Sequence, residues 1–145
     1  MIHLIKDYSD KFFRYLTEDP VRPHIPVNER IGNHKDIFVL PDVENVQAIT
    51  CVSYVDNVPK SEVDLFTDNV EPNIAIFYTI WSYKPGAGRQ LILDSVEYMK
   101  EHNPNIVRFV TLSPKTEMAK RFHLKNGAIV FRENTDTINY EYLLR

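Results

Sequence analysis

Two of the four glycines, Gly86 and Gly88, lie between an apolar segment, Asn73–Trp81, and a segment with helical spacing. Backbone N–H groups at a helix N-terminus bind phosphate oxygens, and glycine lets the ligand approach them closely. The same residues could instead form only a tight turn that needs a positive φ. The pair therefore predicts either a phosphate-binding loop or a simple strand-to-helix turn. It fits neither a P-loop, which needs a lysine, nor a dinucleotide fingerprint, because Leu91 occupies the third small position.

Few other side chains stand out as catalytic groups. Glu71 precedes the apolar segment, and Asp64 and Asp68 lie in the acidic stretch before it. Each carboxylate could serve as a general base or could equally be a solvated loop side chain. Their spacing fits no metal-ligand pattern, so no metal site is expected. His24, in a loop punctuated by prolines, is read as an exposed loop histidine that could border a cleft.

The elements that must position these residues alternate along the chain. A helix is expected from Ser9 or Asp10 to about Glu18, and the prolines that follow keep the chain irregular up to about Gly32. Strands are expected at Ile2–Lys6, Asp36–Leu40, Val46–Val55 and Asn73–Trp81, with one helical turn near Glu62–Phe66. Since Asn73–Trp81 is apolar on both faces, it should be a central strand.

The C-terminal half predicts a crossover and a hairpin. A helix from about Arg89 to His102 joins Asn73–Trp81 to a strand at Ile106–Leu112, which requires a right-handed parallel connection. Then come a helix capped by Ser113, with Met118, Ala119, Phe122 and Leu124 inward, and a hairpin of Ala128–Arg132 and Thr137–Leu144. The expected fold class is α/β of the α+β type: a mixed, mainly antiparallel sheet with a central parallel β-α-β crossover and flanking helices.

The composition is that of a folded domain. The 145 residues are 43% hydrophobic and 26% charged, which predicts one domain over residues 1–145 and excludes disorder for most of the chain. No apolar run is long enough for a membrane helix, and the N-terminus does not resemble a signal peptide. Cys51 is the only cysteine, which excludes an internal disulfide and favours a reducing cytoplasm. The net charge of −3, with no basic stretch, argues against a nucleic-acid partner.

Two motifs resemble those of the GCN5-related N-acetyltransferases, the GNAT superfamily. The acetyl-CoA-binding motif of that family, [Q/R]-x-x-G-x-[G/A], is matched by Gly86 and Gly88 in FYTIWSYKPGAGRQLI, although Tyr83 replaces Gln or Arg. Downstream, residues 116–128 resemble N-x-x-A-x-x-[LF]-Y-x-[KR]-x-G-F. The agreeing positions are Ala119, Phe122, Lys125 and Gly127, and the differing ones are Thr116, His123 and Ala128. The order of expected elements also agrees with the GNAT fold over nearly the whole chain.

The resemblance implies acetyl-CoA as the cosubstrate, bound along the glycine loop. The pantetheine arm would lie against the strand that precedes the loop, and the pyrophosphate would lie on the loop amides. Lys84 or Arg89 could add positive charge there, or could be solvated side chains. The cofactor-binding residues that the resemblance implies are Tyr78, Ile80, Trp81, Ser82, Lys84, Gly86, Ala87, Gly88 and Arg89.

The resemblance also implies direct acetyl transfer in a ternary complex. A base takes a proton from the acceptor amine, which attacks the thioester carbonyl, and an acid protonates the departing thiolate. His123 stands where the family often has a tyrosine acid, and Glu71 is the candidate base. Although an ordinary imidazole, with a pKa of about 6.5, is mostly neutral at pH 7, a helix C-terminus favours its charged form. The alternative for His123 is a helix-end histidine paired with carbonyls.

Three functions therefore remain open, of which a nucleic-acid-acting relative of the family is disfavoured by the acidic balance. The first is a GNAT-like N-acetyltransferase that acetylates a primary amine on a small molecule or a protein lysine. The second is a non-catalytic protein of the same fold that binds coenzyme A or a protein partner, which the departures at Tyr83 and His123 keep open. The expected partners are acetyl-CoA and an amine acceptor, with no nucleic acid and no membrane. Edge strands near the C-terminus could pair two copies into a homodimer.

Overall fold

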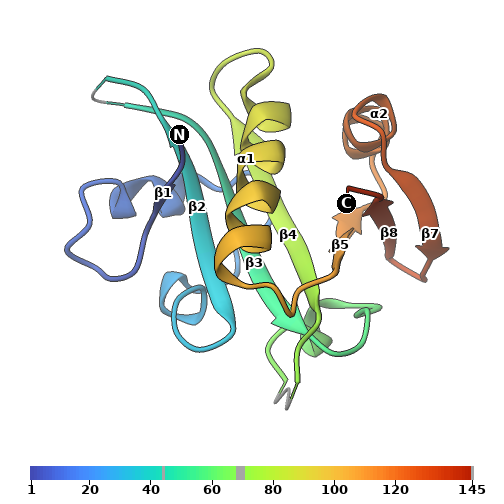
Figure 1. Ribbon diagram of the computed structural model, residues 1–145. Helices are drawn as coiled ribbons and strands as arrows, with labels where there is room; N and C mark the ends of the chain where they lie inside the picture. The colour runs from blue at the N-terminus through green and yellow to red at the C-terminus, as the bar shows by residue number, and fades with distance from the viewer. Residues whose placement is uncertain (44, 68–70, 145) are drawn as a thin grey trace.

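The computed structural model describes residues 1–43, 45–67 and 71–144, which form a twisted sheet with helices against it (Figure 1). The strands are β1 (His3–Leu4), β2 (Lys35–Pro41), β3 (Val46–Val55), β4 (Ile74–Ser82), β5 (Arg108–Thr111), β6 (Ser113–Pro114), β7 (Ile129–Glu133) and β8 (Thr137–Tyr142). The α-helices are α1 (Ala87–His102) and α2 (Glu117–Lys125), and short 3-10 helices span Phe13–Glu18, Val27–Glu29 and Glu62–Asp64.

The sheet order is β1-β2-β3-β4-β5-β8-β6, with β7 paired to β8. Of these pairings, β4–β5 is parallel, and its register runs from Ile74 opposite Arg108 to Phe77 opposite Thr111. The other pairings are antiparallel. Helix α1 makes the connection between β4 and β5. The expected fold class, a mainly antiparallel mixed sheet with one central parallel crossover, is confirmed.

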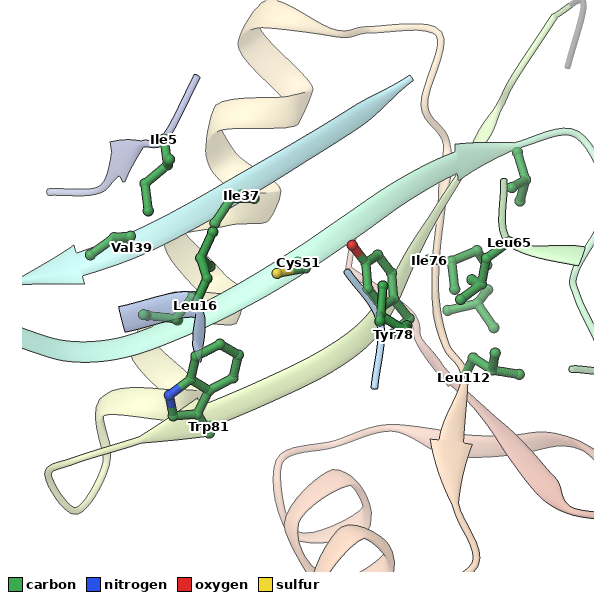
Figure 2. Packing of buried hydrophobic residues seen from close by; sticks show 14 of the residues in the cluster. Ile5, Leu16, Ile37, Val39, Cys51, Leu65, Ile76, Tyr78, Trp81 and Leu112 are labelled. Atoms are coloured by element: carbon green, nitrogen blue, oxygen red, sulfur yellow. The ribbon is translucent and has the colours of Figure 1, made fainter. Parts of the chain in front are cut away.

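Both faces of the sheet are covered, which explains why β4 is apolar on both sides. Leu91, Val96 and Met99 of α1 are buried against one face. On the other face, Leu16 of the N-terminal segment belongs to a second buried cluster with Cys51, Tyr78 and Trp81 (Figure 2). The N-terminal segment, residues 7–32, therefore takes the place that a second layer of helices would occupy.

The N-terminal segment contains less regular structure than its pattern predicts. The expected strand is reduced to His3–Leu4, and the expected α-helix is a 3-10 helix that begins only at Phe13. Asp10 accounts for the late start, because its carboxylate accepts a hydrogen bond from the Phe12 amide and a contact of 2.6 Å from His3. Such local side-chain bonds compete with helix formation. The 3-10 turn at Val27–Glu29 lies in a stretch expected to be irregular.

The start of α2 was also wrongly predicted. Ser113 does not cap the helix, because Ser113 and Pro114 form β6 and pair with β8. The helix begins three residues later, where the Thr116 hydroxyl accepts a hydrogen bond from the Ala119 amide. Met118 is 82% exposed and Leu124 is 39% exposed, so neither belongs to the buried face of the helix as expected. His123 takes the inward position and is buried.

Candidate functional site

The centre of the sheet contains a gap where β4 and β5 separate. Their parallel ladder ends at Phe77 and Thr111, with a last hydrogen bond of 3.2 Å from the Leu112 amide to the Phe77 carbonyl. Beyond that point the chain turns away to form β6 along β8, while β4 continues to Ser82 paired with β3. The far half of β4 thus has a sheet neighbour on one side only.

A β-bulge lies at the point of separation. In the pairing of β3 with β4, Cys51 is opposite Thr79 and the next residue, Val52, is opposite Phe77, so Tyr78 is the extra residue. Bulges bend a strand and increase its twist. The bulge at Tyr78 therefore turns the far half of β4 away from its former neighbour.

A cavity of about 290 Å³ occupies the gap. It extends from α2 and Gly88 on one side to Pro20 and Val21 of the N-terminal segment on the other. The remaining lining residues are Phe77, Tyr78, Thr79, Ile80, Trp81, Ser82, Leu112, Ser113, Pro114, Thr116, Met118, Ala119, Phe122 and His123. An extended chain of several atoms would find both an open strand edge and apolar walls in such a space.

The glycine loop leads from the end of β4 into α1. Gly86 has a φ of +80°, which favours glycine, and no side chain caps the helix there. The first N–H groups of a helix have no partner within it. That of Ala87 is satisfied by the Lys84 carbonyl, whereas those of Gly88 and Arg89 remain for an external acceptor. The first turn carries no acidic residue that would repel an anion.

Gly88 is required for a different reason. A Cβ atom at this position would lie 2.9 Å from the ring of Phe122 on α2, closer than packed atoms tolerate. A side chain at Gly88 would therefore require Phe122 to shift, whether or not a ligand is bound. Helices α1 and α2 thus approach each other closely at Gly88 and Phe122. His123, the next residue on α2, lies at the end of the cavity nearest the glycine loop.

The polar side chains around the loop are engaged with their neighbours. The Tyr83 hydroxyl accepts a hydrogen bond from the Trp81 indole at 3.1 Å and donates one to Glu18. Burial, followed by the bond to Glu18, raises the pKa of Tyr83 to about 12. The ammonium group of Lys84 is paired with Asp42. Tyr83 and Lys84 thus hold the loop to adjacent segments.

His123 is a neutral imidazole at the wall of the cavity. Its Nδ1 atom lies 2.7 Å from the hydroxyl of Tyr142, and its ring stacks on Tyr140 with centroids 5.1 Å apart. Burial lowers the pKa of His123 to about 4, so the expected stabilisation of the charged form by the helix C-terminus is outweighed. Among the described residues it forms no hydrogen bond to a carbonyl and none through Nε2, which is available to a ligand.

Arg22 closes the gap on the side of the N-terminal segment. Its Nε donates a hydrogen bond of 3.1 Å to the Tyr78 carbonyl, and its Nη2 donates one of 2.8 Å to the Leu112 carbonyl. These carbonyls belong to the two strands just beyond their last shared bond. The buried guanidinium therefore spans the gap at its narrow end and satisfies groups that the sheet leaves unpaired.

A second buried charge fixes the segment that carries Arg22. The Asp19 carboxylate accepts hydrogen bonds from the Arg22 amide and from the Thr79 hydroxyl of β4, and it forms a 2.7 Å ion pair with Arg30. Asp19 and Arg30 are almost completely buried. The sequence of this proline-rich segment gave no sign of these contacts, and one of the partners, Thr79, lies 60 residues away.

Comparison with known proteins identifies the fold. No protein-family model matches the sequence, and no curated protein matches it. Tetrahymena GCN5 is a similar solved structure, with a TM-score of 0.65 and 13% identity over 100% of this chain and 98% of that one. A protein described as a streptothricin acetyltransferase, from Bacillus anthracis and in complex with acetyl coenzyme A, has a TM-score of 0.58 and 15% identity over 84% of this chain and 70% of that one. The chain has the GNAT fold.

A malonyl-CoA decarboxylase from Rhodopseudomonas palustris also shares this fold with the chain. Its TM-score is 0.77 at 17% identity, over 99% of this chain and 60% of that one. The chain spans between 35% and 60% of the length of three such decarboxylases. The GNAT fold is therefore shared with proteins named for two different reactions of acyl-CoA.

The residues predicted from the sequence occupy different parts of this GNAT fold. Tyr78, Ile80, Trp81, Ser82 and Gly88 line the cavity, as does His123, whereas Lys84, Gly86, Ala87 and Arg89 form the adjoining loop and helix start. Glu71 lies before β4, at the opposite end of this strand, in a separate hollow with His34 and Tyr54. The structure thus does not bring Glu71 to His123.

The remaining acidic residues add no cluster to the site. Asp68 lies outside the described residues, and Asp64 belongs to the 3-10 helix at Glu62–Asp64. Within the described ranges, no three side chains of His, Cys, Asp or Glu gather as metal ligands would. No helix in the same ranges has the length and apolar character needed to cross a membrane.

Proposed function

We propose that the protein is an N-acetyltransferase that transfers the acetyl group of acetyl-CoA to a primary amine. The observation that carries the proposal is the cavity between the separated strands, with an open edge of β4 on one wall and His123 on another. An enzyme that binds a long acyl-CoA arm needs such an edge, because the arm's amide groups require hydrogen-bond partners.

The groups left unsatisfied fit acetyl-CoA in the orientation expected from the two motifs. The amides of Gly88 and Arg89 at the start of α1 would hold the pyrophosphate, assisted by the helix dipole. The pantetheine arm would lie along Tyr78–Ser82, and the thioester would lie near the bulge. This order places the negatively charged end outside the cavity and the acyl end within it.

His123 is suited to assist departure of the thiolate without being positively charged. A neutral imidazole has one N–H and one acceptor nitrogen. If the Tyr142 hydroxyl donates to Nδ1, the proton of the imidazole lies on Nε2 and can form a hydrogen bond to the sulfur. Most of the residues that line the cavity are apolar, and in such surroundings a bond to a developing negative charge is worth more than it is in water.

Calorimetric titration with acetyl-CoA tests the proposal directly. We expect saturable binding by the wild-type protein and its loss in Ala119→Trp, because Ala119 faces the cavity and the indole would fill it. Lys120→Trp places the same side chain on the exposed surface of α2 and should bind normally. Wild-type protein that binds neither acetyl-CoA nor coenzyme A would contradict the proposal.

A second function, decarboxylation of a malonyl thioester, is favoured by one comparison and one residue. The TM-score to the decarboxylase is 0.77, against 0.65 to GCN5, and the neutral His123 could donate a hydrogen bond to an enolate oxygen. Incubation with malonyl-CoA separates the functions. Release of CO₂ with formation of acetyl-CoA favours decarboxylation, and acetyl transfer from acetyl-CoA to an amine favours the first proposal. Binding without either reaction favours a non-catalytic coenzyme A-binding protein.

A further inference from the structure

A histidine and a glutamate form a close pair beside the narrow end of the gap. The Nε2 atom of His24 lies 2.7 Å from each carboxylate oxygen of Glu62, which fixes the ring through a forked contact. The side chain of His24 is 60% exposed and that of Glu62 is 30% exposed. The pair therefore combines a defined geometry with access from solvent.

Arg22 links this pair to the cavity. The guanidinium that bonds the Tyr78 and Leu112 carbonyls also donates a hydrogen bond of 2.6 Å from Nη1 to Glu62. Both Tyr78 and Leu112 line the cavity. Glu62 thus lies one guanidinium group away from the carbonyls that mark the separation of the strands, and His24 lies next to it.

The segment that carries Glu62 is held by hydrogen bonds from β8, the strand that pairs with β5 and β6. Asn139 of β8 donates hydrogen bonds of 3.1 Å to the Pro59 carbonyl and 2.8 Å to the Thr111 carbonyl. The Thr137 hydroxyl donates one of 2.6 Å to the Lys60 carbonyl. The position of Glu62 is consequently fixed relative to the strands and does not depend on a free loop.

We infer that His24 is the group that receives the acceptor's proton, with Glu62 and Arg22 as positioning residues. This assignment rests on the N-acetyltransferase function proposed above. The cavity reaches Pro20 and Val21, which belong to the same segment as His24. In this assignment the acceptor lies on that side, and acetyl-CoA lies on the side of α1 and α2. Since Glu62 holds the N–H of Nε2, Nδ1 of His24 carries the lone pair that can accept a proton.

The proposed step is balanced in protons and electrons. An alkylammonium acceptor gives one proton to Nδ1 of His24, and Glu62 stabilises the imidazolium that forms. The free amine attacks the thioester carbonyl, and a C–N bond forms while the C–S bond breaks. The second proton of the attacking nitrogen passes to the departing thiolate, and the imidazolium returns its proton to solvent.

The test measures release of coenzyme A from acetyl-CoA in the presence of n-butylamine, spermidine or water alone. For His24→Ala we expect a loss of about 100-fold, the lower range for a general base, with unchanged affinity for acetyl-CoA. Added imidazole should restore part of the rate, because the site is open to solvent. Glu62→Gln should lower the rate less, and Asp64→Asn, the same charge change on the same 3-10 helix, should leave it unaltered.

The outcomes separate this assignment from the function on which it rests. Failure of the wild-type protein to bind acetyl-CoA would remove the proposed function itself. Normal binding with full activity in His24→Ala, or a loss that imidazole does not reverse, would overturn the role of His24. An acetyl-CoA complex from which neither amine nor water releases coenzyme A would overturn it as well. Loss in Glu71→Gln with full activity in Glu62→Gln would assign the role to the other carboxylate.

Discussion

The two halves of β4 belong to one strand but have different surroundings. Residues 74–77 pair with β3 on one side and β5 on the other, whereas residues 79–82, beyond the bulge at Tyr78, pair with β3 alone. Residues 74–77 are all buried, whereas in the second half Ile80 is half-buried and Ser82 is exposed. The first half has a ladder on each side, whereas the second has one ladder and is also held by Asp19 at Thr79 and Arg22 at Tyr78. A binding site can thus form within a sheet where a strand has lost one neighbouring strand and polar side chains from another segment bond part of its free edge.

The largest effect is expected from removing the positive charge of Arg30, which pairs with Asp19 beside the second half of β4. Arg30→Met leaves the fully buried carboxylate of Asp19 without its ion pair, which should lower the free energy of unfolding by about 3–5 kcal/mol. Chemical denaturation measures this value. Lys84→Met breaks an exposed ion pair and should cost below about 1 kcal/mol. Equal effects of the two substitutions would show that the buried pair has no special role.

His123, in the wall of the cavity, should make the free energy of unfolding depend on pH. The pKa of His123 is about 4 in the folded protein, whereas an unfolded histidine titrates near 6.5. Because the unfolded chain binds the proton more readily, stability is complete above about pH 6.5 and falls as the pH approaches 4, by about 3 kcal/mol. Denaturation of the wild type and of His123→Phe at both pH values measures this term. If the variant keeps the same pH dependence, His123 is not its source.

Substitution in the glycine loop should affect binding more than folding. Gly86→Val places a β-branched residue at a φ of +80° and alters the amides at the start of α1. Loss of one charge-assisted contact, about 1.5–3 kcal/mol, corresponds to weaker acetyl-CoA binding by roughly 10- to 100-fold. Gly32→Val introduces comparable backbone strain at a φ of +123°, away from the loop, and should bind normally. Equal loss in both variants would indicate a general effect of strain.

A modest effect on stability is expected where α1 meets α2. Gly88→Ala brings a methyl group to 2.9 Å from the Phe122 ring and should cost about 1–3 kcal/mol. Phe122→Leu removes part of that ring, so the double variant should lose less stability than the sum of the single ones. Additive losses would mean that the two residues do not meet in solution.

The strands of the sheet could be predicted because their patterns are local. Val46–Val55 was predicted with the bounds that the structure shows, since it is a run rich in β-branched residues. Asn73–Trp81 differs from β4 by one residue at each end. Ser113 was misassigned because a serine before a proline suits a helix start, and pairing with β8 overrode that preference. Local preference fails where a distant strand supplies a partner.

Only the part of the candidate site that contains sequence motifs could be predicted. Gly86, Gly88 and His123 were found by spacing and resemblance, although the state of His123 depends on burial that the sequence does not reveal. Arg22 was missed because it lies in a proline-rich loop that was read as exposed. Its bonds reach residues 56 and 90 positions away. No pattern within a short window predicts such a contact.

The contacts of Arg22 also have a consequence for the order of folding. Arg22 can form its hydrogen bonds only after Tyr78 and then Leu112 have been synthesised. The segment that positions Glu62 can form its own only after Asn139 has been synthesised. Closing such long loops is slow and costs entropy before any contact forms. During synthesis the first strands can pair early, but the gap takes its shape only when the last strand has left the ribosome. A chain truncated before β8 would therefore lack the hydrogen bonds that position the segment of Glu62.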